Sequence, residues 1–178
     1  MEESTVDQRE IYRGRVVSVR IDTVQMQNGH VATREVVVHN PAVAMIPVAA
    51  DGRILLVRQW RTPVGSVLLE APAGSADDGE APEAAVQREL QEEIGFRAGR
   101  LNRLGGFWVA PGYCTEYIHV YLCEDLIESR LPGDEDEHIE VTPLTLDEAL
   151  AAIADGTIQD AKTQVGLLLY ERLSRPRR

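Results

Sequence analysis

The sequence predicts an α+β fold in which helices pack on a mixed sheet. β-rich runs dominate the first part of the chain, a single amphipathic helix follows, and further strands precede two C-terminal helices. With 178 residues, of which 44% are hydrophobic, the chain is long enough to bury one sizeable core.

The N-terminal part is predicted to be a loose polar tail over 1–10, followed by a β-hairpin. Residues 16–21 and 34–39 are β-rich runs, and Asn28-Gly29 between them is a tight-turn signal. Three further strands are expected, over 42–49, 54–60 and 67–70.

The first helix is predicted to begin with Pro82 in its first turn and to run to about Ile94, where Gly95 ends it. Strands are expected after it, over 101–109, over 118–123 and near Val141. Thr145 and Glu148 form a capping box that opens a second helix. A last amphipathic helix is predicted over 161–173, with an apolar face made of Val165, Leu168, Leu169 and Leu173.

Charge and composition exclude several classes of protein. The net charge of −11 argues against a binder of nucleic acid or of membrane surfaces. No apolar run approaches the ~18–20 residues of a membrane helix, and the acidic N-terminus does not resemble a secretory signal. We therefore expect a cytoplasmic protein in which Cys114 and Cys123 are reduced thiols.

The segment over 74–96, GSADDGEAPEAAVQRELQEEIGF, carries the chemistry. On a helix, Glu89 and Glu93 are neighbours at i and i+4, and Glu92 lies beside them. Clustered carboxylates repel one another, and a hard cation such as Mg²⁺ or Mn²⁺ relieves the repulsion. The alternative for a bare glutamate cluster is a solvated acidic helix face.

The whole segment decides between these alternatives. It fits the pattern G-x5-E-x7-R-E-U-x-E-E-x-G-U, in which U is bulky and apolar, without a departure. This resembles the Nudix box of the Nudix hydrolases. The resemblance implies an α/β/α sandwich around a mixed sheet and a loop–helix–loop that binds Mg²⁺, or Mn²⁺ in its place, and a nucleoside diphosphate linked to another group.

Shorter matches resemble the ADP-ribose pyrophosphatase branch of this family. They are Pro111 in Ala-Pro-Gly after the box, Arg61 in LVRQWR, Glu70 in EAPAG and Arg34 in TREVV. The branch implies a homodimer in which an N-terminal strand segment, 1–40, is exchanged between subunits, ahead of a Nudix hydrolase domain over 41–178.

The resemblance also implies roles for these residues. Glu89, Glu93 and the backbone carbonyl of Ala73 would be metal ligands. Arg61, Glu70 and Pro111 would contact substrate, and Arg34 would reach in from the partner subunit. Plain surface positions remain the alternative for both arginines. An aromatic ring would stack on the base, with core packing as the alternative for each candidate: Tyr12, Trp60 and Trp108.

An acidic loop after the box provides candidates for the catalytic base. The family resemblance implies Glu135 as the base that activates water and Glu137 as a further metal ligand. Asp136 and Glu140 are alternatives, a solvated loop is another, and Glu92 is the candidate base within the box.

These residues together predict Mg²⁺-dependent hydrolysis of ADP-ribose to AMP and ribose 5-phosphate. The substrate is expected to be a small nucleotide sugar, with neither nucleic acid nor membrane as a partner. One rival is a Nudix hydrolase of another nucleoside diphosphate sugar, such as GDP-mannose. The other is a non-catalytic ADP-ribose sensor, which the complete box disfavours.

Overall fold

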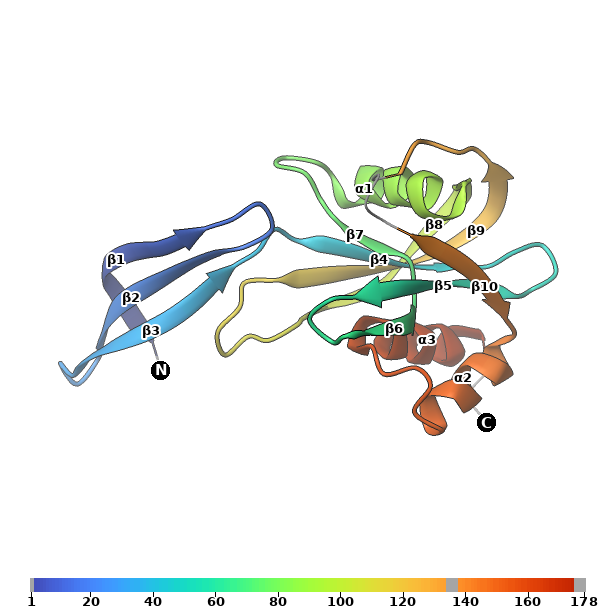
Figure 1. Cartoon of the computed structure of the whole chain (residues 1–178). Helices are drawn as coiled ribbons and strands as arrows, with labels where there is room; N and C mark the ends of the chain where they lie inside the picture. The colour runs from blue at the N-terminus through green and yellow to red at the C-terminus, as the bar shows by residue number, and fades with distance from the viewer. Residues whose placement is uncertain (1, 134–137, 175–178) are drawn as a thin grey trace. The chain divides into compact units, whose positions relative to one another are not determined.

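The computed structural model describes residues 2–133 and 138–174. The chain forms two compact units, the first made of Met1–Pro41 and Phe107–Tyr117 and the second of Ala42–Gly106 and Ile118–Arg178 (Figure 1). Within the described residues, no helix is long and apolar enough to span a membrane.

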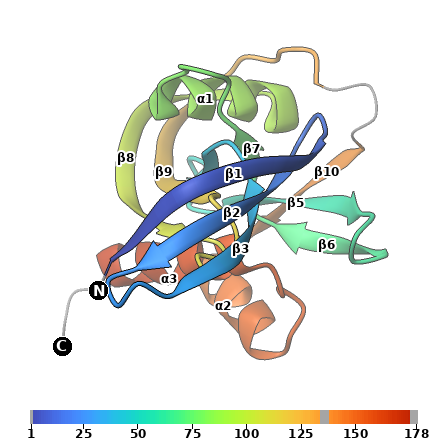
Figure 2. The same cartoon turned by 90° about the vertical axis from the view of Figure 1, so that its left-hand side faces the viewer.

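The first unit contains a three-stranded antiparallel sheet in the order β1-β2-β3 (Figure 2). Its strands are β1 (Glu3–Arg13), β2 (Ser18–Met26) and β3 (Val31–Val38). The predicted turn between β2 and β3 is confirmed, because Gly29 has a φ of 81° and its N–H donates to the Met26 carbonyl at 2.9 Å.

The predicted loose tail is wrong, because β1 occupies most of it. The strand pairs with β2 from Glu3 opposite Met26 to Arg13 opposite Ser18. Every residue of β1 is exposed, so its sequence carries no apolar alternation to reveal it. Main-chain hydrogen bonds to β2 define this strand instead.

The second unit is built on two sheets, ordered β7-β4-β9-β8 and β10-β5-β6. β4 and β9 run parallel, whereas β4–β7, β5–β6 and β5–β10 are antiparallel, so the predicted mixed sheet is confirmed. The strands are β4 (Ala42–Pro47), β5 (Ile54–Arg61), β6 (Ser66–Glu70), β7 (Ala73–Ser75), β8 (Phe96–Trp108), β9 (Tyr117–Glu128) and β10 (Ile139–Leu144).

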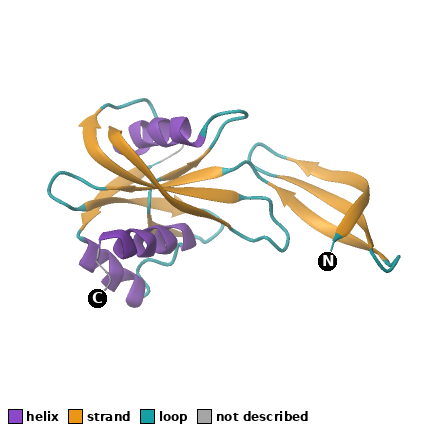
Figure 3. Cartoon of the chain, turned by 180° about the vertical axis from the view of Figure 1, so that it is seen from behind, coloured by secondary structure: helices purple, strands orange, loops and turns teal. Residues whose placement is uncertain are grey.

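Helices cover both faces of these sheets and complete an α/β/α sandwich (Figure 3). Helix α1 (Pro82–Glu89) lies on one side, and α2 (Leu146–Ala154) and α3 (Ala161–Ser174) lie on the other. Alternate residues of each strand enter opposite cores, as Met45 packs on the α1 side and Ile46 on the α3 side. All six residues of β4 are buried, as expected for a strand covered on both faces.

The predicted apolar face of the last helix is wrong for two of its four residues, while Val165 and Leu169 are partly buried. Leu168 and Leu173 are 50% and 62% exposed, and α3 buries Thr163, Gly166 and Leu167 instead. The reason is close packing on β4, since a Cβ on Gly166 would lie 2.7 Å from the Ile46 side chain. The helix therefore approaches the sheet through small residues.

The helix of the glutamate cluster has the predicted extent but changes type. After α1 it continues as a π-helix, η1 (Leu90–Ile94), and Gly95 ends it with a φ of 78°. Single π turns inside α-helices are rare and occur frequently at functional sites. The capping box at Thr145 and the two free cysteines are also confirmed.

Candidate active site

Arg88 is the centre of the carboxylate cluster on α1 and η1. Its guanidinium donates to Glu80 at 2.9 and 3.1 Å, to Glu89 at 2.7 Å and to Glu92 at 3.1 Å. It also donates to the Ser75 carbonyl at 2.9 Å. The hydrogen bonds from Arg88 hold the pKa of Glu80 below its usual range. The Arg88 guanidinium therefore binds carboxylates both from the loop before the helix and from the helix itself.

The loop before the helix lies directly against two of the predicted metal ligands. A Cβ on Gly74 would lie 2.0 Å from the Glu89 carboxylate, so any larger residue there would displace that carboxylate. The Ala73 N–H donates to Glu93 Oε2 at 3.2 Å, and the Glu93 side chain is largely buried. The structure thus brings together Ala73, Glu89 and Glu93, as the sequence predicts.

The donor chemistry of this cluster fits a hard divalent cation, because every side-chain donor is a carboxylate oxygen. Across the described residues, however, no three His, Cys, Asp or Glu side chains are already arranged around one metal position. Arg88 accounts for this arrangement, since it draws Glu89 and Glu92 toward its own guanidinium. The carboxylates are suitable ligands for a divalent cation. To bind one, Glu89 and Glu92 would have to contact the cation and Arg88 at the same time.

Glu70 and Arg61 form a second charged centre at the ends of β6 and β5. Arg61 donates Nε and Nη2 to the two Glu70 oxygens at 2.9 and 2.8 Å. Burial raises the pKa of Glu70, but the hydrogen bonds of Arg61 and the charge of Lys162 outweigh it, so the pKa lies below its usual range. Glu70 is therefore an ionised carboxylate at 1% exposure.

Lys162, at the start of α3, also binds Glu70 Oε2 and lies 3.1 Å from Asp160. Sequence reasoning did not select this residue. A signal was present, because Lys162 is the only lysine in a chain that otherwise uses arginine for its basic side chains. The hydrogen bonds to Glu70 raise the pKa of Arg61 most, and the charge of Glu93 contributes less, which connects this centre to the glutamate cluster.

A family model of the NUDIX domain matches residues 38–163 of this chain. The chain belongs to the Nudix family. A model of the nucleoside diphosphate sugar hydrolase N-terminal domain matches residues 3–37. The cluster around Arg88 is thus the Nudix box, and its loop–helix–loop geometry is the one the sequence pattern predicts.

Individual relatives support the enzyme class. The chain is 38% identical to the ADP-ribose pyrophosphatase of Bacillus subtilis (strain 168), over 92% of this chain and 89% of that protein. It is equally 38% identical to the methanol dehydrogenase activator of Bacillus methanolicus, over 93% and 91%. A GDP-mannose pyrophosphatase of Yersinia enterocolitica is 36% identical over 75% of this chain and 74% of its own length.

A solved structure shares the fold over almost the whole chain. The crystal structure of an ADP compounds hydrolase matches with a TM-score of 0.88 and 26% identity, covering 97% of this chain and 94% of that one. The predictions of a Nudix hydrolase and of a resemblance to the ADP-ribose pyrophosphatases are therefore confirmed.

Two predicted substrate residues belong to the first unit. Arg34 on β3 binds Glu3 of β1 through both Nε and Nη2, and its Nη1 donates to the Thr33 carbonyl at 3.1 Å. Pro111 lies in a turn closed by the Cys114 N–H, which donates to the Ala110 carbonyl at 2.8 Å. The roles of both residues in this Nudix enzyme stay predictions.

The predicted base Glu135 and metal ligand Glu137 lie outside the described residues. The chain just before them is anchored to the box helix. The Leu131 N–H donates to the Gln91 carbonyl at 3.1 Å, and a Cβ on Gly133 would lie 3.3 Å from the Glu92 carbonyl oxygen. The described chain between β9 and the acidic segment therefore lies beside the box helix, at Gln91 and Glu92.

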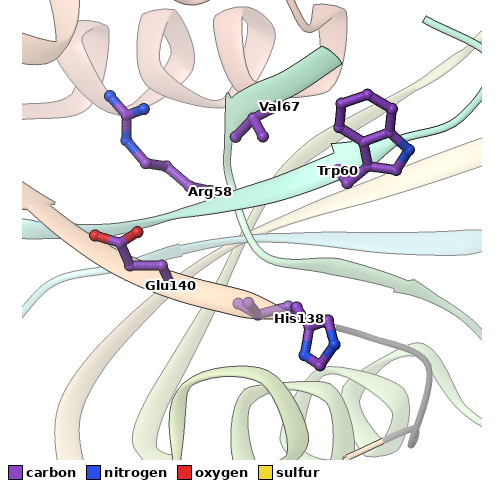
Figure 4. Close-up of a pocket in the computed structure, with 6 residues that line it drawn as sticks. Arg58, Trp60, Val67, His138 and Glu140 are labelled. Atoms are coloured by element: carbon purple, nitrogen blue, oxygen red, sulfur yellow. The ribbon is translucent and has the colours of Figure 1, made fainter. Parts of the chain in front are cut away.

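The alternative that the three aromatic candidates pack in the core is wrong, because Tyr12, Trp60 and Trp108 are each more than half exposed. Trp60 lines a pocket in the second unit (Figure 4), together with Arg58, Val67, His138, Ile139 and Glu140. Successive side chains on a strand point to opposite faces, so Trp60 and Arg61 lie on opposite sides of β5. This geometry argues against both residues contacting the same nucleotide.

The pKa of Glu70 makes a prediction for stability. A carboxyl whose pKa is lowered by folding stabilises the fold fully above its ordinary value, 4.5, and this contribution declines as the pH falls through the lowered value. We expect Glu70→Gln to reduce the free energy of unfolding most above pH 4.5, with the difference from wild type shrinking in acid. Urea unfolding across a pH series measures it, and a pH-independent difference would contradict it.

Proposed function

We propose that this Nudix enzyme hydrolyses the diphosphate linkage of ADP-ribose to AMP and ribose 5-phosphate in a Mg²⁺-dependent reaction. The observation that carries the proposal is the connection of two charged centres by a single segment. Glu70 of this segment binds Arg61, and Ala73, three residues later, binds Glu93 of the box. A diphosphate needs both centres, since an arginine fork binds its oxygens and carboxylates hold the cation that neutralises it.

Each residue has a defined part in this proposal. Glu89, Glu93, the Ala73 carbonyl and Glu137 would hold Mg²⁺. When bound, the cation supplies charge neutralisation for the diphosphate and lowers the pKa of bound water. Arg61, held by Glu70, orients the diphosphate. The charge balance supports this division, because a chain of net charge −11 cannot neutralise an anionic substrate with its own side chains.

The reaction adds one water across the P–O–P bond. The water oxygen bonds to one phosphorus, the bridging oxygen leaves with the other, and the proton of the attacking water passes to a general base, for which we propose Glu135. AMP and ribose 5-phosphate together contain all the atoms of ADP-ribose and the water.

Product analysis tests the proposal. The purified chain is incubated with ADP-ribose and Mg²⁺ in ¹⁸O water, and the products are identified by mass. We expect AMP and ribose 5-phosphate, label in one of them that reports the phosphorus attacked, and no turnover in EDTA. Binding of ADP-ribose without products would instead indicate a sensor.

A second candidate, hydrolysis of another nucleoside diphosphate sugar, is favoured by the similarity to a GDP-mannose pyrophosphatase. A panel of ADP-ribose, GDP-mannose and related nucleotide sugars, compared by kcat/KM, separates the two candidates. A clear preference for GDP-mannose would replace ADP-ribose as the proposed substrate.

We also propose that the N-terminal strands support a homodimer with an exchanged segment. Removing residues 1–40 takes away Val37, whose N–H donates to the Tyr113 carbonyl at 2.7 Å and whose carbonyl accepts from the Thr115 N–H. We expect the truncated chain to be inactive and poorly soluble, and the full chain to sediment as a dimer. A fully active monomer at micromolar concentration would contradict this prediction.

A further inference from the structure

The only lysine of this chain lies in a buried ionic contact rather than on the surface. The Lys162 side chain is 11% exposed, and its ammonium contacts Glu70, whose side chain is 1% exposed, and Asp160. Lysine is among the residues least often buried unless it is paired, and the 17 other basic residues here are arginines. The buried ammonium of Lys162 therefore contacts a specific atom, Glu70 Oε2.

We propose that Lys162 is a positioning residue that fixes the substrate-binding guanidinium of Arg61 by sharing the Glu70 carboxylate with it. The inference rests on the proposed function, because it assigns Arg61 to the substrate diphosphate. It adds a residue of α3 to a site that is otherwise made of β5, β6 and the Nudix box.

The shared oxygen is the basis of the proposal. Glu70 Oε2 accepts from Arg61 Nη2 at 2.8 Å and also from Lys162 Nζ, while Oε1 accepts from Arg61 Nε at 2.9 Å. The two-bond fork fixes the plane of the guanidinium only as long as the carboxylate itself is fixed. Lys162 fixes that carboxylate from the side of α3.

The residue type fits this part. An ammonium is a compact point charge that can serve two carboxylates at once, whereas a second planar guanidinium would compete for the fork geometry. The Arg61 side chain as a whole is 35% exposed, and the two hydrogen bonds to Glu70 use Nε and Nη2 but not Nη1. That part of Arg61 is the one available to a diphosphate oxygen.

A separate contact anchors the start of α3, which allows a matched control. The Thr163 hydroxyl accepts from the Ala71 N–H at 2.7 Å and donates to Asp160 at 2.5 Å. This contact holds the helix to the segment after Glu70 without adding a charge beside Arg61. Thr163→Ala therefore loosens the same junction and removes a hydrogen bond to Asp160, which Lys162 also contacts, but it keeps the Lys162 and Glu70 side chains.

A double-mutant cycle tests the inference. We expect Lys162→Met to raise KM for the nucleotide sugar roughly tenfold to a hundredfold, the loss typical of a charge-assisted contact, with a smaller change in kcat. Lys162→Arg keeps the charge but brings a second guanidinium to the fork, so it should recover only part of this loss. If Lys162 acts through Arg61, the double variant with Arg61→Gln should have the KM of Arg61→Gln alone.

A structural role gives different results. The inference would be overturned if the KM effects of Lys162→Met and Arg61→Gln were additive in the double variant. It would also be overturned if Thr163→Ala, at the same loss of stability, raised KM as much as Lys162→Met does. Absence of turnover by wild type on the whole panel of nucleotide sugars would overturn the proposed function and the inference together. Turnover by wild type with an additive cycle would overturn the inference alone.

A measurement with Lys162 intact covers the case in which Lys162→Met does not fold. Because the chain has one lysine, its ¹³Cε–¹⁵Nζ pair gives a single side-chain signal by nuclear magnetic resonance. In Glu93→Gln with Mg²⁺, added ADP-ribose should shift this signal, and Arg61→Gln should abolish the shift. A signal that does not move at saturation, or that moves equally without Arg61, would overturn the inference.

Discussion

Glu93→Gln is expected to lower kcat by several orders of magnitude while leaving the fold intact. The Ala73 N–H donates to one Glu93 oxygen at 3.2 Å, and a glutamine can offer its amide oxygen to that donor. The change therefore keeps size and the loop contact but removes the charge that a divalent cation requires. Initial rates across a Mg²⁺ titration, with thermal unfolding in parallel, measure the effect.

The matched control is Glu83→Gln on the same helix. Glu83 accepts the Tyr121 hydroxyl at 2.7 Å, which a glutamine oxygen can also do, and it occupies an unspecified position of the box pattern. We expect near wild-type kcat from this control. A near-normal rate for Glu93→Gln in saturating Mg²⁺ would refute the metal assignment.

The sequence predicted the fold correctly where turn and capping residues marked the ends of the elements. Asn28-Gly29, Pro82, Gly95 and Thr145 mark turns and helix ends, and the structure places all of them as predicted. β1 was missed because its pairing depends on backbone hydrogen bonds, which leave no apolar pattern. The face of α3 was misassigned at Leu168 and Leu173 because Gly166 sets the contact by its small size, which a hydrophobic pattern does not reveal.

The candidate site divides in a similar way. Helix spacing predicted that Glu89 and Glu93 are neighbours, and the family resemblance implied that Ala73 lies with them. The sequence did not predict a role for Lys162. This residue lies far from Glu70 in the sequence and contacts it only because α3 packs against the end of β6. Long-range ionic contacts of this kind depend on tertiary structure, and a single sequence carries only the hint of an unusual lysine.

Glu135→Gln is expected to lower kcat by roughly 10²–10⁴ while leaving KM nearly unchanged, the usual range for loss of a general base. The structure supports looking for the base outside the helix, because Glu89 and Glu92 are both engaged by Arg88. Gly133, the last described residue before the acidic segment, lies next to the Glu92 carbonyl of η1, where a Cβ would be 3.3 Å from its oxygen. Rates over a range of pH measure both the loss and the disappearance of the acidic limb, because a general base acts only when it is deprotonated.

Controls on both sides of the loop separate a base from a general charge effect. Glu128→Gln removes an exposed carboxylate of β9 and should leave kcat near wild type. Glu140→Gln tests the alternative on β10, where Glu140 pairs with Arg58 across the ladder. A kcat loss at Glu140 with none at Glu135 would move the base to the strand.

Glu137→Gln should differ from Glu135→Gln in its dependence on metal. A lost metal ligand weakens the apparent Mg²⁺ affinity, so part of the rate should return at high Mg²⁺, whereas a lost base is not restored by metal. A Mg²⁺ titration of both variants therefore assigns the two roles independently. If Glu135→Gln keeps the wild-type kcat and pH profile, the base lies elsewhere, and Glu92 becomes the stronger candidate because its side chain is the more exposed of the two helix glutamates that Arg88 holds.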